Sequence, residues 1–267
     1  MLNGKSATVT GSTSGIGLGV ARAFAARGAN VVLNGFGDAA EIAKLRKSLG
    51  PEHGVSVAYG AADMSKADEV VGMVEQATHD FDRVDILVNN AGVQYTAPVH
   101  EFPAERWNAV IAINLSAAFY AIRAALQQML ARNWGRIINI ASTHDLIASV
   151  HKAAYVAAKH GIVGMTKVVA LETATTGVTC NAICPGWVLT PLVQKQIDDL
   201  GEREKLAPQA AKTKLLGEKQ PSLEFARPSR SPRQRRSCAP TGRRRSGASR
   251  CRSTAAGRHN RQSELAP

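Results

Sequence analysis

The sequence lacks the features that would place the protein in a membrane or around a structural metal. The chain begins Met1-Leu2-Asn3-Gly4-Lys5 with no apolar signal region, and no apolar run reaches the roughly 20 residues that span a bilayer. Of its four cysteines, Cys180 and Cys184 are four apart, with no CxxC spacing and no partner histidine, so no metal site is expected. We expect buried free thiols in a reducing compartment, which makes the cytoplasm the default location.

The net charge of +12 normally suggests a nucleic-acid or membrane partner, but the charge is not spread over the chain. Residues 226–267 hold 12 arginines, no lysine and one acidic residue, Glu264, and therefore carry +11. Of the 33 basic and 21 acidic residues in the chain, 21 and 20 remain in residues 1–225, which carry only +1. The body of the protein therefore has no electrostatic reason to bind a nucleic acid or a membrane.

Residues 226–267 also lack valine, isoleucine, methionine, phenylalanine, tyrosine and tryptophan, and contain a single leucine. Such a segment cannot bury enough apolar surface to offset the entropy lost on ordering. We expect residues 1–225 to form a dinucleotide-binding and catalytic domain, with a substrate flap at 188–218, and residues 226–267 to form a disordered basic tail.

Short β-branched runs alternate with longer amphipathic segments through the body, which is typical of a parallel sheet flanked by helices. Predicted strands cover residues 6–10, 30–33, 55–58, 85–88, 136–140 and 178–183. Predicted helices cover residues 15–27, 38–49, 66–79, 103–133 (broken in two) and 154–175, with Asp38 capping the second. Right-handed crossovers then give an α/β fold with one doubly wound, Rossmann-type sheet.

A glycine-rich turn joins the first predicted strand to the first predicted helix. Glycines in such a turn let the backbone approach a pyrophosphate, whose charge lies at the positive end of the helix. A lone turn of this kind is a weak signal for dinucleotide binding. The candidate cofactor-binding residues here are Gly11, Thr13, Ser14, Gly15, Ile16 and Gly17.

The segment Asn34-Gly35-Phe36-Gly37-Asp38, which ends the second strand, bears on the choice between NAD and NADP. An acidic residue about twenty positions after the first glycine binds the adenosine ribose of NAD, and here Asp38 comes late. No arginine or lysine lies at Ser14 or directly after the strand to neutralise a 2′-phosphate. We therefore expect NAD, with Phe36 packing near the adenosine and Asp63 accepting from the adenine amino group.

Tyr155 and Lys159 are four residues apart and share one face of a helix. A tyrosine with the ordinary pKa of about 10 is a poor base near neutrality, but a nearby ammonium and a positive nicotinamide ring lower that pKa. Lys159 can also hold the nicotinamide ribose, and Ser142, at the end of a strand, can hydrogen-bond the reacting oxygen. The group predicts hydride transfer between an alcohol carbon and a nicotinamide, with Tyr155 moving the proton. Taken alone, the pair could equally be surface residues.

Together these motifs resemble the short-chain dehydrogenase/reductase family. The glycines of residues 10–17 follow the order T-G-x-x-x-G-x-G, and Asn89-Asn90-Ala91-Gly92 close the fourth predicted strand. The resemblance implies that residues 89–92 stabilise the central sheet, with Asn90 on the adenosine side of the cofactor, and that Val188 also contacts the cofactor. It further implies that Asn114, otherwise a kink or polar cap in an apolar helix, holds a water linking Lys159 to solvent.

Within this family, residues 1–225 resemble the bacterial D-3-hydroxybutyrate dehydrogenases, through residues 34–37, 90–94, 141–144, 151–155 and 184–191. The resemblance implies a homotetramer, and substrate contacts from Ser142, Tyr155 and a carboxylate grip formed by Gln94, His144, Lys152 and Gln196. A small acid independently requires a cation with convergent donors, and Lys152 lies three residues before Tyr155. Trp187 offers an apolar wall for a methyl group.

Alternatives remain open at this stage. His144 can be a loop cap, Lys152 a solvated lysine and Gln94 a turn residue. The enzyme can be another dehydrogenase/reductase, with a ketoacyl or sugar substrate. The protein can also be a non-catalytic nucleotide- or nucleic-acid-binding protein. Binding of DNA through the arginine-rich tail would weaken steeply as the salt concentration rises.

The tail itself departs from the family, whose chains continue through a helix and a glycine-rich last strand that helps form a subunit interface. We hypothesise that residues 226–267 are the same DNA read one base out of register. With synonymous codons rich in G and C, the shifted frame of residues 249–259 can spell Ile-Ala-Val-Ser-Val-Asp-Gly-Gly-Trp-Thr-Ala. Without that strand, we expect residues 178–183 to form an open sheet edge, the tetramer to lose a contact and activity to be impaired.

Overall fold

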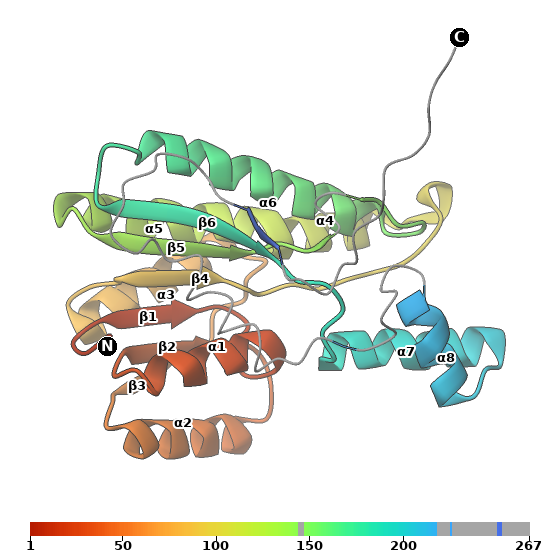
Figure 1. Ribbon diagram of the computed structural model, residues 1–267, viewed down its shortest axis with the longest axis horizontal. Coiled ribbons are helices and arrows are strands. Elements are labelled where there is room, and N and C mark those ends of the chain that lie inside the picture. The colour runs from red at the N-terminus through yellow and green to blue at the C-terminus, as the bar shows by residue number, and fades with distance from the viewer. Residues whose placement is uncertain (144–146, 218–224, 226–249, 253–267) are drawn as a thin grey trace, which may run out of the picture.

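Seven parallel strands form one sheet in the order β3-β2-β1-β4-β5-β6-β7 in the computed structural model, which describes residues 1–143, 147–217, 225 and 250–252 (Figure 1). The order reverses between β1 and β4, as in a doubly wound fold, so the predicted fold class is confirmed. The strands are β1 Ser6–Val9, β2 Asn30–Asn34, β3 Val57–Gly60, β4 Ile86–Asn89, β5 Gly135–Ile140, β6 Val178–Cys184 and β7 Arg250–Arg252.

Helices cover both faces of the sheet. On one face, α1 (Gly15–Ala25) and α2 (Ala39–His53) bury side chains against β1 and β2. On the other, α3 (Ala67–Phe81), α5 (Ala117–Ala131) and α6 (Ala153–Glu172) share a larger core with the central strands. Beyond the strand ends, α7 (Pro191–Glu204) and α8 (Pro208–Gly217) pack on each other within the segment for which a substrate flap is predicted (Figure 1).

Local chemistry explains where several of these elements begin. Asp38 caps α2 as predicted, since its Oδ1 accepts from the backbone N–H of Glu41 at 3.0 Å. Thr190 does the same for α7, accepting from Val193, and Pro191 occupies the first turn, where a missing N–H costs nothing. Cys180 and Cys184 on β6 are buried free thiols, as predicted, and burial raises the pKa of Cys180 to about 12.

The apolar segment between η1 (Val99–Glu101) and β5 corrects two predictions. The helix predicted to break in two continues from α4 (Ala104–Ile111) into α5 through a π-helical turn, η2 (Ala112–Ser116), which accommodates one extra residue per turn. Taken together, Ala104–Ala131 is also long and apolar enough to cross a membrane by length and composition. Its buried side belongs to the core under the sheet, so packing explains that composition.

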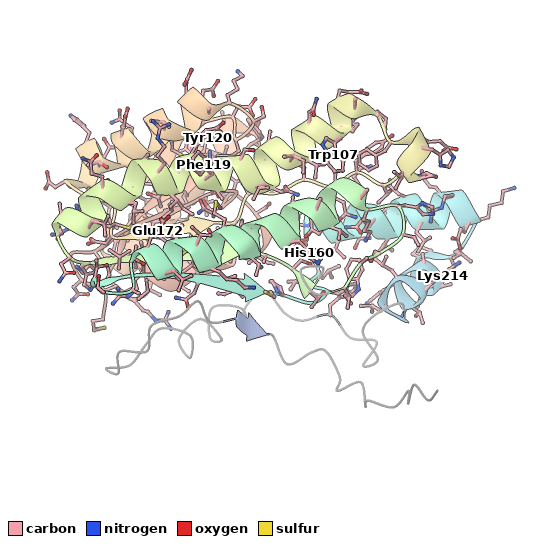
Figure 2. The ribbon with its side chains drawn as sticks, turned by 90° about the horizontal axis from the view of Figure 1, so that it is seen from above. Trp107, Phe119, Tyr120, His160, Glu172 and Lys214 are labelled. Atoms are coloured by element: carbon pink, nitrogen blue, oxygen red, sulfur yellow. The ribbon has the colours of Figure 1, made fainter. Side chains whose placement is uncertain are left out.

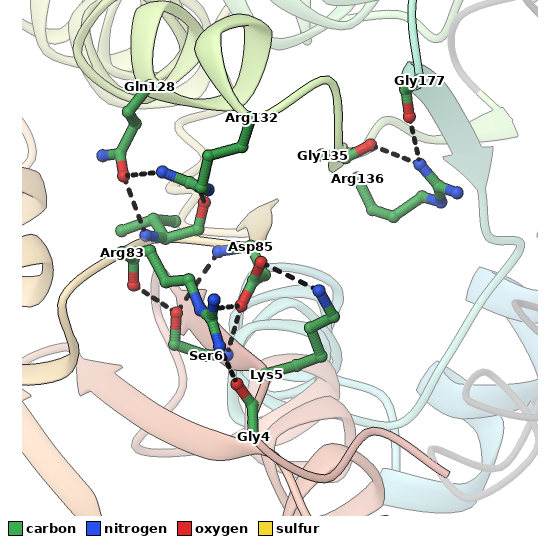
Figure 3. Close-up of polar contacts among 11 residues, drawn as sticks. Gly4, Lys5, Ser6, Arg83, Asp85, Gln128, Arg132, Gly135, Arg136 and Gly177 are labelled. Atoms are coloured by element: carbon green, nitrogen blue, oxygen red, sulfur yellow. Dashed lines mark hydrogen bonds and ion pairs between the residues drawn. The ribbon is translucent and has the colours of Figure 1, made fainter.

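Charged side chains fasten the amino-terminal edge of the sheet, opposite the strand ends that carry the predicted site. The buried carboxylate of Asp85 accepts from Lys5 Nζ at 3.3 Å, Arg83 Nε at 3.2 Å and the backbone N–H of Ser6 at 3.0 Å (Figure 3). Arg136 reaches the carbonyl oxygens of Gly135 and Gly177 at 2.7 Å each, which ties β5 to the start of β6 (Figure 3). These contacts hold the strand register from the end where no chemistry is expected.

The edge of the sheet at β6 differs in part from the sequence-based prediction. The prediction of an open edge at β6 is wrong for Ala182–Cys184, which pair with β7, because a ladder uses backbone groups and needs no apolar side chains. One face of β5 and β6 is nevertheless only half-buried, at Ile138, Thr179 and Asn181, whereas the alternate residues are buried. The described residues therefore cover this face incompletely.

Candidate active site

A cavity of about 340 Å³ opens where the strands end, at the crevice beside the reversal of strand order, where ligands bind in such folds. The loops after β1, β2, β4, β5 and β6 all contribute to its walls. The predicted site residues that line it are Gly11, Thr13, Ser14, Gly15, Ile16, Phe36, Asn90, Gln94, Ser142, Lys152, Tyr155, Lys159, Trp187, Val188 and Gln196.

The glycine turn is held in shape by Asn34, a residue that sequence reasoning missed. Asn34 Oδ1 accepts from the Gly11 N–H at 3.1 Å, and its Nδ2 donates to the carbonyls of Gly60 and Ala62 at 3.0 Å each. Gly15, at the start of α1, has φ of +57°, a backbone conformation that favours glycine. The open turn at a helix amino terminus fits the pyrophosphate of a dinucleotide.

Asn90 joins the end of β4 to the same turn. Its Nδ2 donates to the carbonyls of Thr10 and Gly11 at 2.9 Å each, while Thr10 Oγ1 accepts from the N–H groups of Asn90 and Ala91. The neighbouring Asn89 donates to Asn139 Oδ1 at 2.8 Å, across to β5. Residues 89–92 thus stabilise the central sheet, as the resemblance implied.

Two predicted cofactor contacts do not reach the cavity wall. A Cβ added at Gly17 would lie 2.2 Å from the carbonyl oxygen of Gly11, so this glycine permits close packing of α1 on the turn. The carboxylate of Asp63 accepts from the N–H and Oγ of Ser65, at 2.9 and 2.8 Å, and these bonds hold its pKa below the usual value. Its neighbours Ala62 and Met64 line the cavity instead.

Tyr155, Lys159 and Ser142 meet at the cavity, as predicted. Tyr155 hydrogen-bonds Ser142, and Lys159 Nζ lies 5.5 Å from the centre of the Tyr155 ring while donating to the Ile140 carbonyl at 2.7 Å. The 20-residue helix α6 places Tyr155 and Lys159 on one face. Lys159 is only 4% exposed, so the ammonium is held inside the protein next to the phenol.

The electrostatics of this pair differ from the sequence-based prediction. Burial raises the pKa of Tyr155, and the hydrogen bond from Ser142 only partly opposes that effect. Burial also lowers the pKa of Lys159 to about 8, against a smaller opposing effect of Cys184. The prediction that the phenol pKa is lowered is therefore wrong for the chain by itself, because burial of the phenol outweighs the hydrogen bond from Ser142.

Asn114 lies in the π-helical turn and is 1% exposed. Its Nδ2 donates to the Val93 carbonyl and its Oδ1 accepts from the Val93 N–H, both at 2.8 Å. The side chain therefore holds the loop that carries Gln94, and it faces a small separate cavity rather than the main one. The water-holding role implied by the resemblance stays a prediction, whereas the loop contact is a function that the sequence did not suggest.

Three of the four predicted carboxylate ligands converge at the other end of the cavity. Gln196 Oε1, on α7, accepts from Lys152 Nζ at 3.1 Å and from Gln94 Nε2 at 3.2 Å. Lys152 is 7% exposed, and its Nζ lies 4.9 Å from the centre of the Trp187 ring. The fourth predicted ligand, His144, lies outside the described residues. A buried cation with convergent amides is the arrangement that a small carboxylate requires.

Comparison with known proteins agrees with this geometry. The pattern that defines the short chain dehydrogenase family matches residues 5–201. A D-beta-hydroxybutyrate dehydrogenase of Cupriavidus necator is 60% identical over 85% of this chain and 88% of its own length, and one of Rhizobium meliloti is 49% identical over 83% and 86%. The crystal structure of a substituted actinorhodin polyketide ketoreductase with NADPH is 32% identical, with a TM-score of 0.87 over 96% of this chain and 98% of that one.

The buried ammonium yields a stability prediction. Below about pH 8 Lys159 is charged in both the folded and unfolded states, so burial destabilises the fold, by about 3 kcal/mol for a pKa lowered from 10.5 to about 8. From there to pH 10.5 only the unfolded state keeps the proton, so the free energy of unfolding rises with pH. Lys159→Met, despite leaving the Ile140 carbonyl without its donor, should be more stable than the parent at pH 7.

Urea unfolding at pH 7 and pH 10 measures this effect, and the difference between the two proteins should shrink at the higher pH. Lys167→Met, at an exposed position of the same helix, is the matched control and should change stability little at either pH. A Lys159→Met protein with no gain at pH 7 would contradict the assignment of a costly buried ammonium.

Proposed function

Because the chain belongs to the short-chain dehydrogenase family, we propose that it interconverts D-3-hydroxybutyrate and acetoacetate with NAD. The observation that carries the proposal is the convergence of Lys152, Gln94 and Gln196 in the same cavity as Tyr155 and Lys159. In the proposal, the first three residues hold a carboxylate and Tyr155 transfers a proton beside them, which suits an acid bearing a hydroxyl two carbons from its carboxylate. The sequence identity to two D-beta-hydroxybutyrate dehydrogenases supports this choice of substrate.

The chain's own residues account for binding and proton transfer. Lys152 and the two glutamine amides hold the carboxylate, and Trp187 forms an apolar wall beside them. Ser142 hydrogen-bonds the reacting oxygen and Tyr155 takes its proton during oxidation, returning it during reduction. A bound nicotinamide dinucleotide supplies the acceptor for the hydride that leaves the alcohol carbon. Lys159 supplies positive charge beside the phenol and is placed to hold the nicotinamide ribose.

The preference for NAD over NADP rests on charge at the adenosine end. The part of the cavity wall that follows β2 is formed by Asn34, Gly35 and Phe36, with no basic side chain. The next charged residue along the chain is Asp38, whose carboxylate caps α2. The 2′-phosphate of NADP would have no cationic partner there and would be repelled by a nearby carboxylate. The uncharged ribose hydroxyls of NAD are not repelled.

A ketoacyl or sugar substrate is the second candidate, favoured by the structural likeness to a polyketide ketoreductase. A neutral substrate makes no use of the positive charge of the buried Lys152, and so explains less of the cavity. A nucleic-acid-binding function would rest on residues 226–267 alone, since the body is nearly neutral.

Tyr155→Phe removes the proton acceptor while keeping the ring. Turnover of D-3-hydroxybutyrate should fall about 10²–10⁴-fold, while NAD still binds. Steady-state oxidation followed by NADH absorbance, with NAD affinity measured by calorimetry, tests the role. Near-normal turnover in this variant would rule out Tyr155 as the proton-transfer group.

Lys152→Ala removes the cation of the carboxylate grip. The Michaelis constant for D-3-hydroxybutyrate should rise roughly 10–100-fold, as expected for a lost hydrogen bond to a charged group, while that for NAD changes little. Lys195→Ala, an exposed lysine on α7 paired with Asp199, is the matched control and should leave both constants unchanged. An equal effect of Lys152→Ala on both constants would contradict the grip.

We also propose a cytoplasmic homotetramer. The outer surface of α4, α5 and α6 exposes large apolar side chains, among them Trp107 at 39%, Phe119 at 49% and Leu171 at 69%. Figure 2 shows the α4–α5 helix and α6 running side by side, with Trp107 and Phe119 on the first and Glu172 on the second. An apolar surface formed by adjacent long helices suits burial against a second copy of the chain.

For residues 226–267 we propose a shifted reading frame of the gene. β7, at Arg250–Arg252, pairs with β6 and falls within the stretch 249–259, whose shifted frame can spell Ile-Ala-Val-Ser-Val-Asp-Gly-Gly-Trp-Thr-Ala. This pairing supports the proposal, because a strand encoded by the other frame over residues 249–259 would need the same backbone partner on β6.

A chain with its tail restored to the other frame should be more active and form a larger assembly than the present chain. NAD-linked oxidation of D-3-hydroxybutyrate and mass by light scattering compare the two proteins side by side. Sequencing the gene supplies the independent check. A shifted frame without a family-like ending, or equal activity and mass of the two proteins, would contradict the proposal.

A further inference from the structure

The phenol of Tyr59, which does not line the cavity, hydrogen-bonds the backbone of the loop after β2. Tyr59, on β3, lies opposite Leu33 of β2 in the parallel ladder. Its hydroxyl reaches past the end of β2 and donates to the carbonyl oxygen of Gly35 at 2.6 Å. The Tyr59 side chain also packs against the core under α1 and α2, so its ring is fixed on that side.

A second hydroxyl holds the next peptide unit. Thr13 Oγ1, from the glycine turn, donates to the carbonyl oxygen of Phe36 at 3.0 Å. Gly35, whose carbonyl makes the first of the two contacts, has φ of +146°, and a Cβ added there would lie 2.5 Å from Thr13 Oγ1. The loop after β2 therefore takes a conformation that glycine permits and that two hydroxyls from different elements maintain.

These two contacts set the direction of two consecutive peptide planes. In a planar trans peptide the carbonyl and the N–H point to opposite sides, so fixing the Gly35 carbonyl also fixes the N–H of Phe36. Fixing the Phe36 carbonyl does the same for Gly37. The Phe36 side chain between them is 69% exposed and lines the cavity, so its position depends on these peptide planes rather than on packing.

We propose that Tyr59 is a positioning residue for the adenosine half of the dinucleotide, an inference that rests on the proposed cofactor. No acidic side chain follows β2 directly, so the ribose hydroxyls meet backbone groups of residues 35–37, and Tyr59 fixes the orientation of that backbone. Tyr59 acts through Gly35 and is remote from Tyr155 and Ser142, which belong to the other end of the cavity. The consequence is a selective effect on the adenosine half of the cofactor.

Tyr59→Phe removes only the hydroxyl and tests the inference by calorimetry with ADP-ribose, NAD and nicotinamide mononucleotide. The dissociation constants for ADP-ribose and NAD should rise about 2–10-fold, the effect of one lost hydrogen bond. Nicotinamide mononucleotide affinity, turnover at saturating NAD and the Michaelis constant for D-3-hydroxybutyrate should not change. Tyr120→Phe, on α5 and away from this loop, is the matched control.

Gly35→Ala is a second variant that displaces the same loop without altering Tyr59, and it should show the same selective loss of ADP-ribose affinity. Unchanged ADP-ribose binding in Tyr59→Phe, or an equal loss for nicotinamide mononucleotide, would overturn the inference while leaving hydroxybutyrate oxidation by the parent intact. The opposite result is also possible. If the parent chain binds ADP-ribose, the variants lose that affinity selectively, and the parent does not oxidise D-3-hydroxybutyrate, the proposed substrate is refuted and the role of Tyr59 stands.

Discussion

The burial of one ammonium group governs the chemistry of this site. Lys159 is held almost wholly inside the protein by helix α6, with its Nζ bonded to the Ile140 carbonyl at the end of β5. That position is costly, because burial lowers its pKa to about 8, and it is reached only because a long helix packs along the central strands. Tyr155 is one turn away on the same helix, so the sheet, the helix and the cation together determine where the phenol lies. The fold thus loses stability beside the phenol that we propose transfers the proton.

The sequence predicted the fold well, because the determining signals are local and repeated. Short β-branched runs identified the strands to within two residues at most ends, and the Asp38 cap and the glycine turn marked helix starts. Tyr155, Lys159 and Ser142 could be grouped because helical spacing and strand ends place side chains predictably. Lys152 and Gln196 are 44 residues apart, and only the resemblance, not any periodicity, joined them before the structure did.

Contacts that depend on tertiary geometry could not be foreseen. Asn34 looks like any strand residue, yet it holds the glycine turn, and the π-helical turn at Asn114 leaves no mark in an apolar helical sequence. The pKa of Tyr155 was misjudged because the effect of burial depends on the depth of the side chain. Pairing of β7 with β6 was missed because composition reports what side chains can bury, whereas a ladder needs only backbone groups.

The contacts of Gln196 link α7 to the two side chains that we propose to bind the substrate carboxylate. Its single Oε1 accepts from both Lys152 and Gln94, so α7 is joined to the body of the protein through the same donors that a carboxylate would use. An incoming carboxylate must therefore either replace Oε1 as the acceptor or turn the amide so that Nε2 donates to it. In the first case substrate competes with the flap contact, and in the second it adds to that contact. Since a bound anion adds a charge-assisted partner for Lys152 that the neutral amide cannot equal, the second arrangement keeps all three side chains satisfied and holds α7 over the cavity.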